Sequence, residues 1–212
     1  MNTSSFARCS RCVAAALCLA ALSACDALRP GSAPHPAFYT LDSARRAETV
    51  AIPATAPTLT ITPPYAAAGF DSPRMIYVRE THKLEYFANS AWADPPARML
   101  APLLVAAVEN TGAFRAVVQK PGTATGDLRL DTEIIRLQQD FRTQPGRAQF
   151  TLRAYLIDEK TRRVLAWREF DGAVPVTRED PYGGVVAANR AVQIVLENLA
   201  IFCAEEARSV RY

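Results

Sequence analysis

Few residues of the types that carry catalysis are spaced so that they could act together. Asp131 and Glu133 lie two positions apart in a predicted strand, so both would point to one side, as an acid and base pair requires. That side is also the polar, solvent-facing side of the strand, which favours two solvated carboxylates. The two histidines offer each other no partner, because His35 lies in a Pro-rich segment and His82 in a predicted turn. We therefore predict no catalytic residue, no metal site and no enzymatic activity.

The common catalytic motifs are missing as well. After residue 24 the sequence has no Gly-x-Ser-x-Gly, no His-Glu-x-x-His, no Cys-x-x-Cys and no phosphate-binding glycine loop. The 212 residues carry a formal charge of +3, and without Arg8 and Arg11, which lie in the predicted leader, 22 basic and 21 acidic residues remain. Basic and acidic residues are interleaved along the chain, so no nucleic-acid-binding surface is expected. The sequence favours a binding or assembly module.

Residues 1–24 have the pattern of a secretory leader: two early arginines, a short apolar run and small residues before Cys25. The apolar run is shorter than the roughly 20 residues that cross a bilayer. Leu22-Ser23-Ala24-Cys25 resembles the bacterial lipobox, in which the Cys thiol receives a diacylglyceryl group and the new amine an acyl chain such as palmitate. A plain secretory cleavage site with a chance Cys is the alternative. We predict lipidation of Cys25, which would hold the protein on a membrane without crossing it.

The remaining cysteines support no disulfide framework. Cys9, Cys12 and Cys18 lie in the leader, so Cys203 alone would accompany Cys25 in the mature chain. Cys203 lies in an apolar stretch and is expected to be buried and unreactive.

Residues 25–57 are predicted to be a lipidated Cys followed by a flexible tether. The twelve positions from Asp26 to Ala37 are rich in Pro, Gly, Ser and Ala, and at about 3.1 Å each they reach at most roughly 37 Å. Residues 58–212 are predicted to form one domain, in keeping with a rough size of 150 residues per domain.

Hydrophobic periodicity in the domain predicts an α+β fold, in which an antiparallel sheet of hairpins and a meander packs against two helices. The polar-apolar alternation at 58–62 predicts a half-buried strand, and the segments around 80–83 predict a hairpin turn. A phase change at Ile135 predicts a β-bulge. Asp94 before Pro95 predicts a capped helix start, with a kink or a later start caused by Pro102. The predicted strands are 58–62, 75–79, 84–88, 114–120, 128–137, 148–156 and 163–171, and the predicted helices are 95–111 and 182–208.

Taken in order, several short motifs resemble those of the ABC-type transport auxiliary lipoproteins. The matching positions are Cys25 and residues 38–41, 69–77, 84–87, 92–96, 99–100, 112–114 and 187–191. Each motif alone is weak, whereas their order and spacing are specific. Pro102 within the first helix is the main departure from the family pattern.

The resemblance implies a noncatalytic periplasmic subunit of an MCE-type ABC transport system that moves lipids between inner and outer membranes. The implied partners are a periplasmic MCE-domain protein, an ABC permease and its ATPase, and a homo-oligomer is compatible with this role. No cofactor is implied apart from the covalent lipid on Cys25. The family resemblance favours the outer membrane, whereas Asp26 after Cys25 resembles the inner-membrane retention signal of enteric bacteria.

A lipid-binding carrier with its own apolar cavity is the alternative function. A cavity of several hundred cubic ångströms would favour a carrier, and a packed core would favour docking. The candidate partner-binding residues are Phe87, Trp92 and Tyr39. Phe87 and Trp92 lie in an expected loop before a helix, where aromatic side chains are typical interface anchors, and Tyr39 lies in a short β-prone segment at the start of the domain. Trp92 could instead fasten that helix to the sheet.

Overall fold

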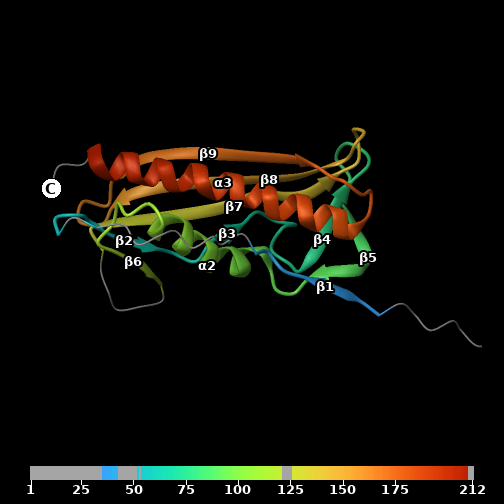
Figure 1. The fold of residues 1–212 in the computed structure, drawn as a ribbon, viewed down its shortest axis with the longest axis horizontal. Coiled ribbons are helices and arrows are strands. Elements are labelled where there is room, and N and C mark those ends of the chain that lie inside the picture. The colour runs from blue at the N-terminus through green and yellow to red at the C-terminus, as the bar shows by residue number, and fades with distance from the viewer. Residues whose placement is uncertain (1–34, 43–51, 53, 121–125, 210–212) are drawn as a thin grey trace, which may run out of the picture. The chain divides into compact units, whose positions relative to one another are not determined.

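The computed structural model describes residues 35–42, 52, 54–120 and 126–209. The elements follow the order β1 (Ala37–Tyr39), β2 (Thr58–Ile61), β3 (Tyr65–Ala66), β4 (Arg74–Val78), β5 (Glu85–Trp92), α2 (Pro96–Glu109), β6 (Ala116–Gln119), β7 (Leu128–Asp140), β8 (Arg147–Asp158), β9 (Val164–Pro175) and α3 (Pro181–Ser209). In this part of the chain nine strands form one sheet and two helices pack on it (Figure 1). The predicted α+β class is confirmed.

The three longest strands, β7, β8 and β9, form an antiparallel meander. Apolar side chains alternate with polar ones along each strand, so one face of the meander is apolar. The register between β7 and β8 shifts between Ile134 and Arg136, which confirms the predicted β-bulge. The bulge moves the apolar side chains after Ile134 back to the same face, and Leu137 is therefore buried with Ile134.

The other edge of β7 differs from the prediction of an antiparallel sheet. Here β2, β3 and β4 each pair with β7 in parallel, one after another along its length. Strand β2 is also paired with β6, so that all four of its residues are buried instead of half-buried. The sheet is therefore mixed: among the described residues five strand pairs, most of them short, are parallel, and the long β7–β8 and β8–β9 pairs and the β4–β5 hairpin are antiparallel.

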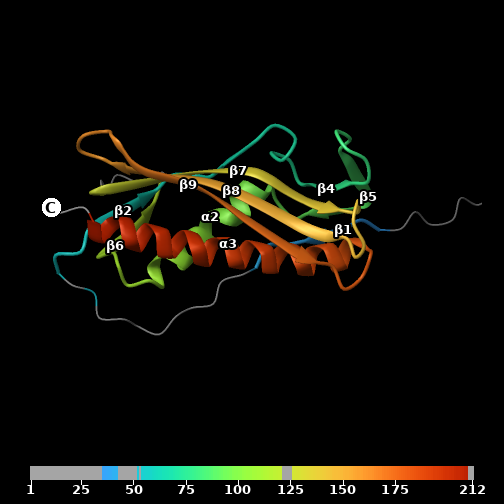
Figure 2. The ribbon, with the colours of Figure 1, turned by 90° about the horizontal axis from the view of Figure 1, so that it is seen from above.

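Helix α3 covers one face of the meander, which we call the inner face; the opposite one is the outer face. Figure 2 shows the sheet on one side and α3 running along the other. Side chains of α3 such as Val192, Leu196 and Leu199 are almost fully buried against β8 and β9. By length and composition this helix could span a membrane, but 56% of its most apolar window is buried in the fold. The predicted helix 182–208 agrees with these bounds to within a residue at each end.

Helix α2 differs from the prediction in its start. The N-cap is Pro95, which makes no side-chain hydrogen bond, and Asp94 instead lies 3.5 Å from Arg98 as an ion pair. Pro102 lies inside the helix and is exposed. Because proline has no N–H, the Arg98 carbonyl receives no helical hydrogen bond from it, and this carbonyl lies on the solvent side of the helix. The helix continues through Pro102 without a break.

The region before α2 contains the predicted hairpin, but β5 is longer than expected. Strands β4 and β5 pair across the turn that holds His82, and β5 continues to Trp92. The expectation of a loop at 87–92 is therefore wrong: a register shift between Arg74 and Ile76 accommodates extra residues in β5, and β1 pairs with its end. The folded unit begins before residue 58, because Ala37–Tyr39 already belong to the sheet.

Candidate functional site

The three predicted partner-binding residues gather around the junction of β1 and β5, mostly inside the protein. Trp92 is 4% exposed and belongs to the hydrophobic core, where it lies opposite Tyr39 in the strand register. Tyr39 and Phe87 are half-buried against the same core. The burial of Trp92 in the core favours a structural role, as in the alternative that this ring fastens the helix to the sheet, and it removes the ring from the accessible surface.

Phe87 belongs to an aromatic cluster near the end of the sheet. Its ring centroid lies 4.6 Å from that of Tyr77 and 6.5 Å from that of Phe141, and Tyr77 and Phe141 are 5.8 Å apart. These rings join the β4–β5 hairpin to the turn after β7. The cluster holds the hairpin in place, because paired aromatic rings contribute about 0.5–1.5 kcal/mol beyond their buried area.

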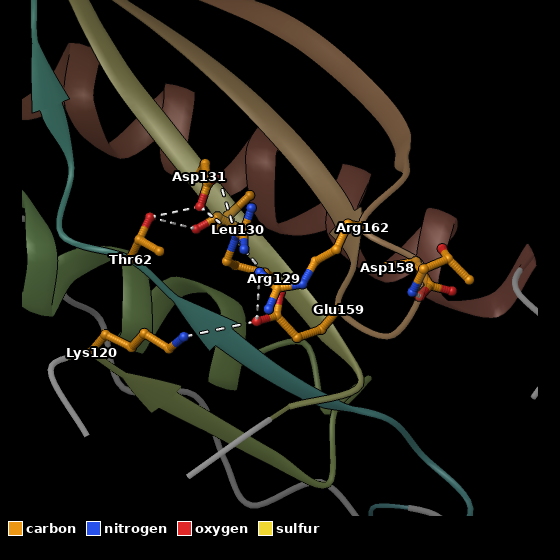
Figure 3. Close-up of polar contacts among 9 residues, drawn as sticks. Thr62, Lys120, Arg129, Leu130, Asp131, Asp158, Glu159 and Arg162 are labelled. Atoms are coloured by element: carbon orange, nitrogen blue, oxygen red, sulfur yellow. Dashed lines mark hydrogen bonds and ion pairs between the residues drawn. The ribbon is translucent and has the colours of Figure 1, made fainter. Parts of the chain in front are cut away.

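Asp131 and Glu133 do point to the same face of β7, as predicted, but each contacts a different cation. Arg129 lies 3.1 Å from Asp131, whose carboxylate also accepts a hydrogen bond of 2.9 Å from Thr62 (Figure 3). Glu133 lies 3.5 Å from Arg153. The Asp131 ion pair lies within β7, and the Glu133 ion pair joins β7 to β8, which is the arrangement of a structural network and not of an acid and base pair.

A second carboxylate, Glu159, is the centre of the network in Figure 3. Its side chain is 8% exposed and is approached by Arg129 at 3.0 Å, Arg162 at 3.8 Å and Lys120 at 3.9 Å. These contacts join the β8–β9 turn to β7 and to the end of β6. In the same turn, the amide of Thr161 donates to Asp158 at 2.7 Å, and this hydrogen bond lowers the pKa of the carboxyl.

The outer face of the meander carries aromatic side chains that the sequence analysis did not single out. Trp167 of β9 is 62% exposed and stacks on Tyr155 of β8, with ring centroids 6.3 Å apart. Tyr65 of β3 is 77% exposed and lies opposite Glu133 in the register. The alternation in β9 contains the signal: Trp167 has the opposite phase to the buried Phe170, so it must point away from the core.

Between these rings, charged residues form a row across the three strands. Arg153 lies between Glu133 at 3.5 Å and Glu169 at 2.9 Å, and the hydrogen bond from Arg153 to Glu169 raises the pKa of the guanidinium. The outer face thus has exposed aromatic rings around a row of one arginine and two glutamates. Such a composition resembles that of protein interfaces, where aromatic residues and Arg are enriched. We define the candidate docking surface as Tyr65, Tyr155, Trp167 and the row Glu133–Arg153–Glu169.

A small cavity lies near the start of α3. It has room for about 20 Å³ and is lined by residues that include Phe87, Trp92, Gln139 and Gly184. That volume is close to the space needed for one water molecule and far below that of an acyl chain. The Gln139 side chain has no hydrogen-bond partner among the described residues, and such a polar amide does not suit an apolar ligand.

The other candidate reactive groups lie apart. His82 is exposed in the β4–β5 turn with a φ of 66°. Burial raises the pKa of the Cys203 thiol to about 12, so it is protonated at neutral pH. Within the described residues no three His, Cys, Asp or Glu side chains gather to hold a metal ion. Cys25 and most of the predicted tether lie outside the described part of the chain.

Comparisons with known proteins give a family and a fold. Residues 39–200 match the model of a family described as an ABC-type transport auxiliary lipoprotein component. A crystal structure of the protein XCC0632 from Xanthomonas campestris has a TM-score of 0.71 and 25% identity, covering 81% of this chain and 97% of that protein. The crystal structure of an uncharacterised protein has a TM-score of 0.62 and 13% identity, covering 80% of this chain and 99% of that one. No curated protein matches this chain.

Proposed function

This chain belongs to the family of ABC-type transport auxiliary lipoprotein components, and from that premise we propose that it is a noncatalytic periplasmic subunit of an MCE-type system that moves lipids between the inner and outer membranes. In this proposal Cys25 carries the lipid and the folded domain binds the MCE-domain protein, the permease or both. Neither membrane is favoured by the described residues, so fractionation on a density gradient is the experiment that decides between them.

One observation supports docking as the activity of the domain. The outer face of the meander is open along β7–β9 and carries Tyr65 and Trp167 at 77% and 62% exposure. A monomeric domain gains little from exposing such large rings, whereas a partner would bury them at modest entropic cost. The occupant proposed for the candidate docking surface is therefore the periplasmic protein of the same transport system.

The carrier alternative is less well supported by the geometry. The cavity at Gln139 is roughly the size of one water molecule, and the Leu and Val side chains of the inner face pack against α3. A protein that carries a lipid needs an apolar space for at least part of an acyl chain.

Co-purification tests the proposed function. The mature lipoprotein, solubilised in mild detergent and captured by a C-terminal tag, is expected to bring down an MCE-domain protein together with a permease and an ATPase, identified by mass spectrometry. A Cys25→Ala variant serves as the control for anchoring, since it can receive no diacylglyceryl group and should not incorporate radiolabelled palmitate. Capture of none of these proteins from native membranes would reject the proposal.

The noncatalytic part of the proposal has its own test. A variant with Asp131→Asn, Glu133→Gln and His82→Asn removes the groups that come closest to acid-base chemistry, while leaving side chains of similar size. Lipid transport is expected to stay near the wild-type rate provided that the domain remains folded and that co-purification shows the partner still bound, because Glu133 belongs to the candidate docking surface. A folded triple variant that binds its partner but no longer supports transport would show that a proton-transfer step exists.

A further inference from the structure

Three exposed aromatic rings surround β1, the strand that follows the predicted lipid tether. Phe38 of β1 is 67% exposed, Tyr182 in the first turn of α3 is 53% exposed and Tyr86 of β5 is 40% exposed. Figures 1 and 2 place β1 at the margin of the sheet, next to the first turns of α3 and to β5. None of these rings belongs to the candidate docking surface.

The strand register brings Phe38 and an arginine onto the same face. Phe38 lies opposite Ala91 of β5, and Ala91 lies opposite Arg74 of β4, so the side chains of Phe38 and Arg74 point the same way. The guanidinium of Arg74 lies over the ring of Tyr86, 4.8 Å from its centroid. This side of the strand thus holds two exposed aromatic rings and an exposed arginine.

The other side of β1 repeats the combination. Tyr39 points away from Phe38, and its ring lies 6.3 Å from that of Tyr182. The guanidinium of Arg178 lies 5.7 Å from the centroid of Tyr182 and pairs with Asp180. Arg74 is exposed and makes no ion pair with any described residue. We name the tether-side patch for the residues that flank the edge strand β1 on both of its sides: Phe38, Arg74, Tyr86, Arg178 and Tyr182.

The length of chain between the predicted anchor and β1 limits how far this patch can be from a bilayer. Cys25 and Ala37 are twelve positions apart, so the tether reaches at most roughly 37 Å and brings β1 closest to the membrane on average. A short tether raises the local concentration of a binding site to the millimolar range, at which weak contacts become occupied. This step rests on the lipidation of Cys25 that the proposed function includes.

We propose that the tether-side patch binds the headgroup region of the bilayer in which Cys25 is anchored, with a preference for anionic lipids. Tyr and other amphipathic rings favour the interface between water and hydrocarbon, and Arg binds lipid phosphates while its stem covers apolar surface. Each cationic side chain near an anionic leaflet contributes about 1 kcal/mol to the free energy of membrane contact, which corresponds to a change of about fivefold in the contact equilibrium. The membrane contact orients the domain and leaves the candidate docking surface for the transport partner.

An environment-sensitive probe on the full mature lipoprotein tests the proposal. Phe38→Cys provides an attachment site for the fluorophore NBD, and Ile201→Cys, 55% exposed near the other end of α3, is the matched control. Cys203 is fully buried, which protects it from labelling. Each labelled protein is reconstituted into vesicles of phosphatidylethanolamine with phosphatidylglycerol, or of phosphatidylcholine alone, and folding is checked by circular dichroism.

The probe at residue 38 is expected to show blue-shifted, stronger emission in the anionic vesicles, with the probe at residue 201 unchanged. Arg74→Gln and Arg178→Gln should each lower the contact equilibrium by about fivefold, and high salt should weaken it. A protein that floats with the vesicles while the residue 38 probe remains in water overturns the patch but not the anchor. A protein that does not float refutes the anchor and the patch together. A blue shift that requires the transport partner would assign the patch to a protein interface instead.

Discussion

The inner and outer faces of the β7–β9 meander are built from the same three strands, yet they carry opposite kinds of side chain. On the inner face Leu130, Phe150 and Leu152 are completely buried under α3. On the outer face Trp167 is 62% exposed and Arg153 is held between two glutamates. Since burial on the inner face supplies most of the free energy of folding, the exposed aromatic residues of the outer face are less constrained by folding and are available for binding.

The largest effect is expected from placing a charge on the inner side. Leu196 of α3 is 3% exposed and belongs to the hydrophobic core, so Leu196→Asp would put a carboxylate among apolar side chains. The free energy of unfolding should fall by about 5 kcal/mol or more, so that little folded protein remains. Thermal denaturation followed by circular dichroism measures this. A midpoint within a degree or two of the wild type would show that this side of α3 is accessible.

The second largest loss of stability is expected at Trp92, the buried one of the two tryptophans. Trp92→Ala removes a ring that is 4% exposed, and the cavity it leaves should lower the free energy of unfolding by about 3–5 kcal/mol. Urea denaturation measures the change, and Trp92→Phe is the control that keeps most of the volume. A stable, folded Trp92→Ala domain would contradict the core position and restore this residue as a docking candidate.

The sequence predicted the parts of the fold that depend on neighbouring residues. The meander, its bulge at Ile135 and the final helix follow from periodicity, because local hairpins and one amphipathic face determine them. The parallel pairs of β7 with β2, β3 and β4 join segments far apart in the chain, and no local pattern specifies which strands meet.

The candidate site was predicted less well, for a related reason. Phe87 and Trp92 were expected in a loop before the helix, but a partner strand on each side makes this segment part of β5. Tyr39 was expected at the surface and is half-buried. The alternation in β9 could have identified Trp167 as exposed, whereas the position of Tyr65 depends on the pairing of β3 with the distant β7.

A smaller and pH-dependent effect is expected at the end of β7. The Asp140 side chain is 5% exposed and accepts hydrogen bonds from Arg142 at 2.7 and 2.9 Å, and Arg142 lowers the pKa of the carboxyl. A pKa that is lower in the folded state stabilises the protein above the ordinary carboxyl pKa of about 4, and the contribution is lost as pH falls through the folded value. Asp140→Asn should therefore cost roughly 1–3 kcal/mol at pH 7 and little in strong acid.

Urea denaturation at several pH values measures the difference between wild type and Asp140→Asn. Asp71→Asn, at an exposed position, is the matched control and should change stability little at any pH. A difference that stays constant from neutral pH to below the folded pKa would contradict the role of the ionised carboxylate.

The smallest effect on stability is expected on the outer face, where the largest effect on binding should occur. Trp167→Ala removes an exposed ring stacked on Tyr155, so the free energy of unfolding should change by about 1 kcal/mol or less. If the candidate docking surface binds the transport partner, the same change should abolish most co-purification, because aromatic residues near the centre of an interface commonly contribute more than 2 kcal/mol. Ile201→Ala is the control. It truncates an apolar side chain of α3 that is 55% exposed, and it should change neither the free energy of unfolding nor co-purification. Unaltered co-purification of the folded Trp167→Ala protein would show that the docking site does not lie on the outer face.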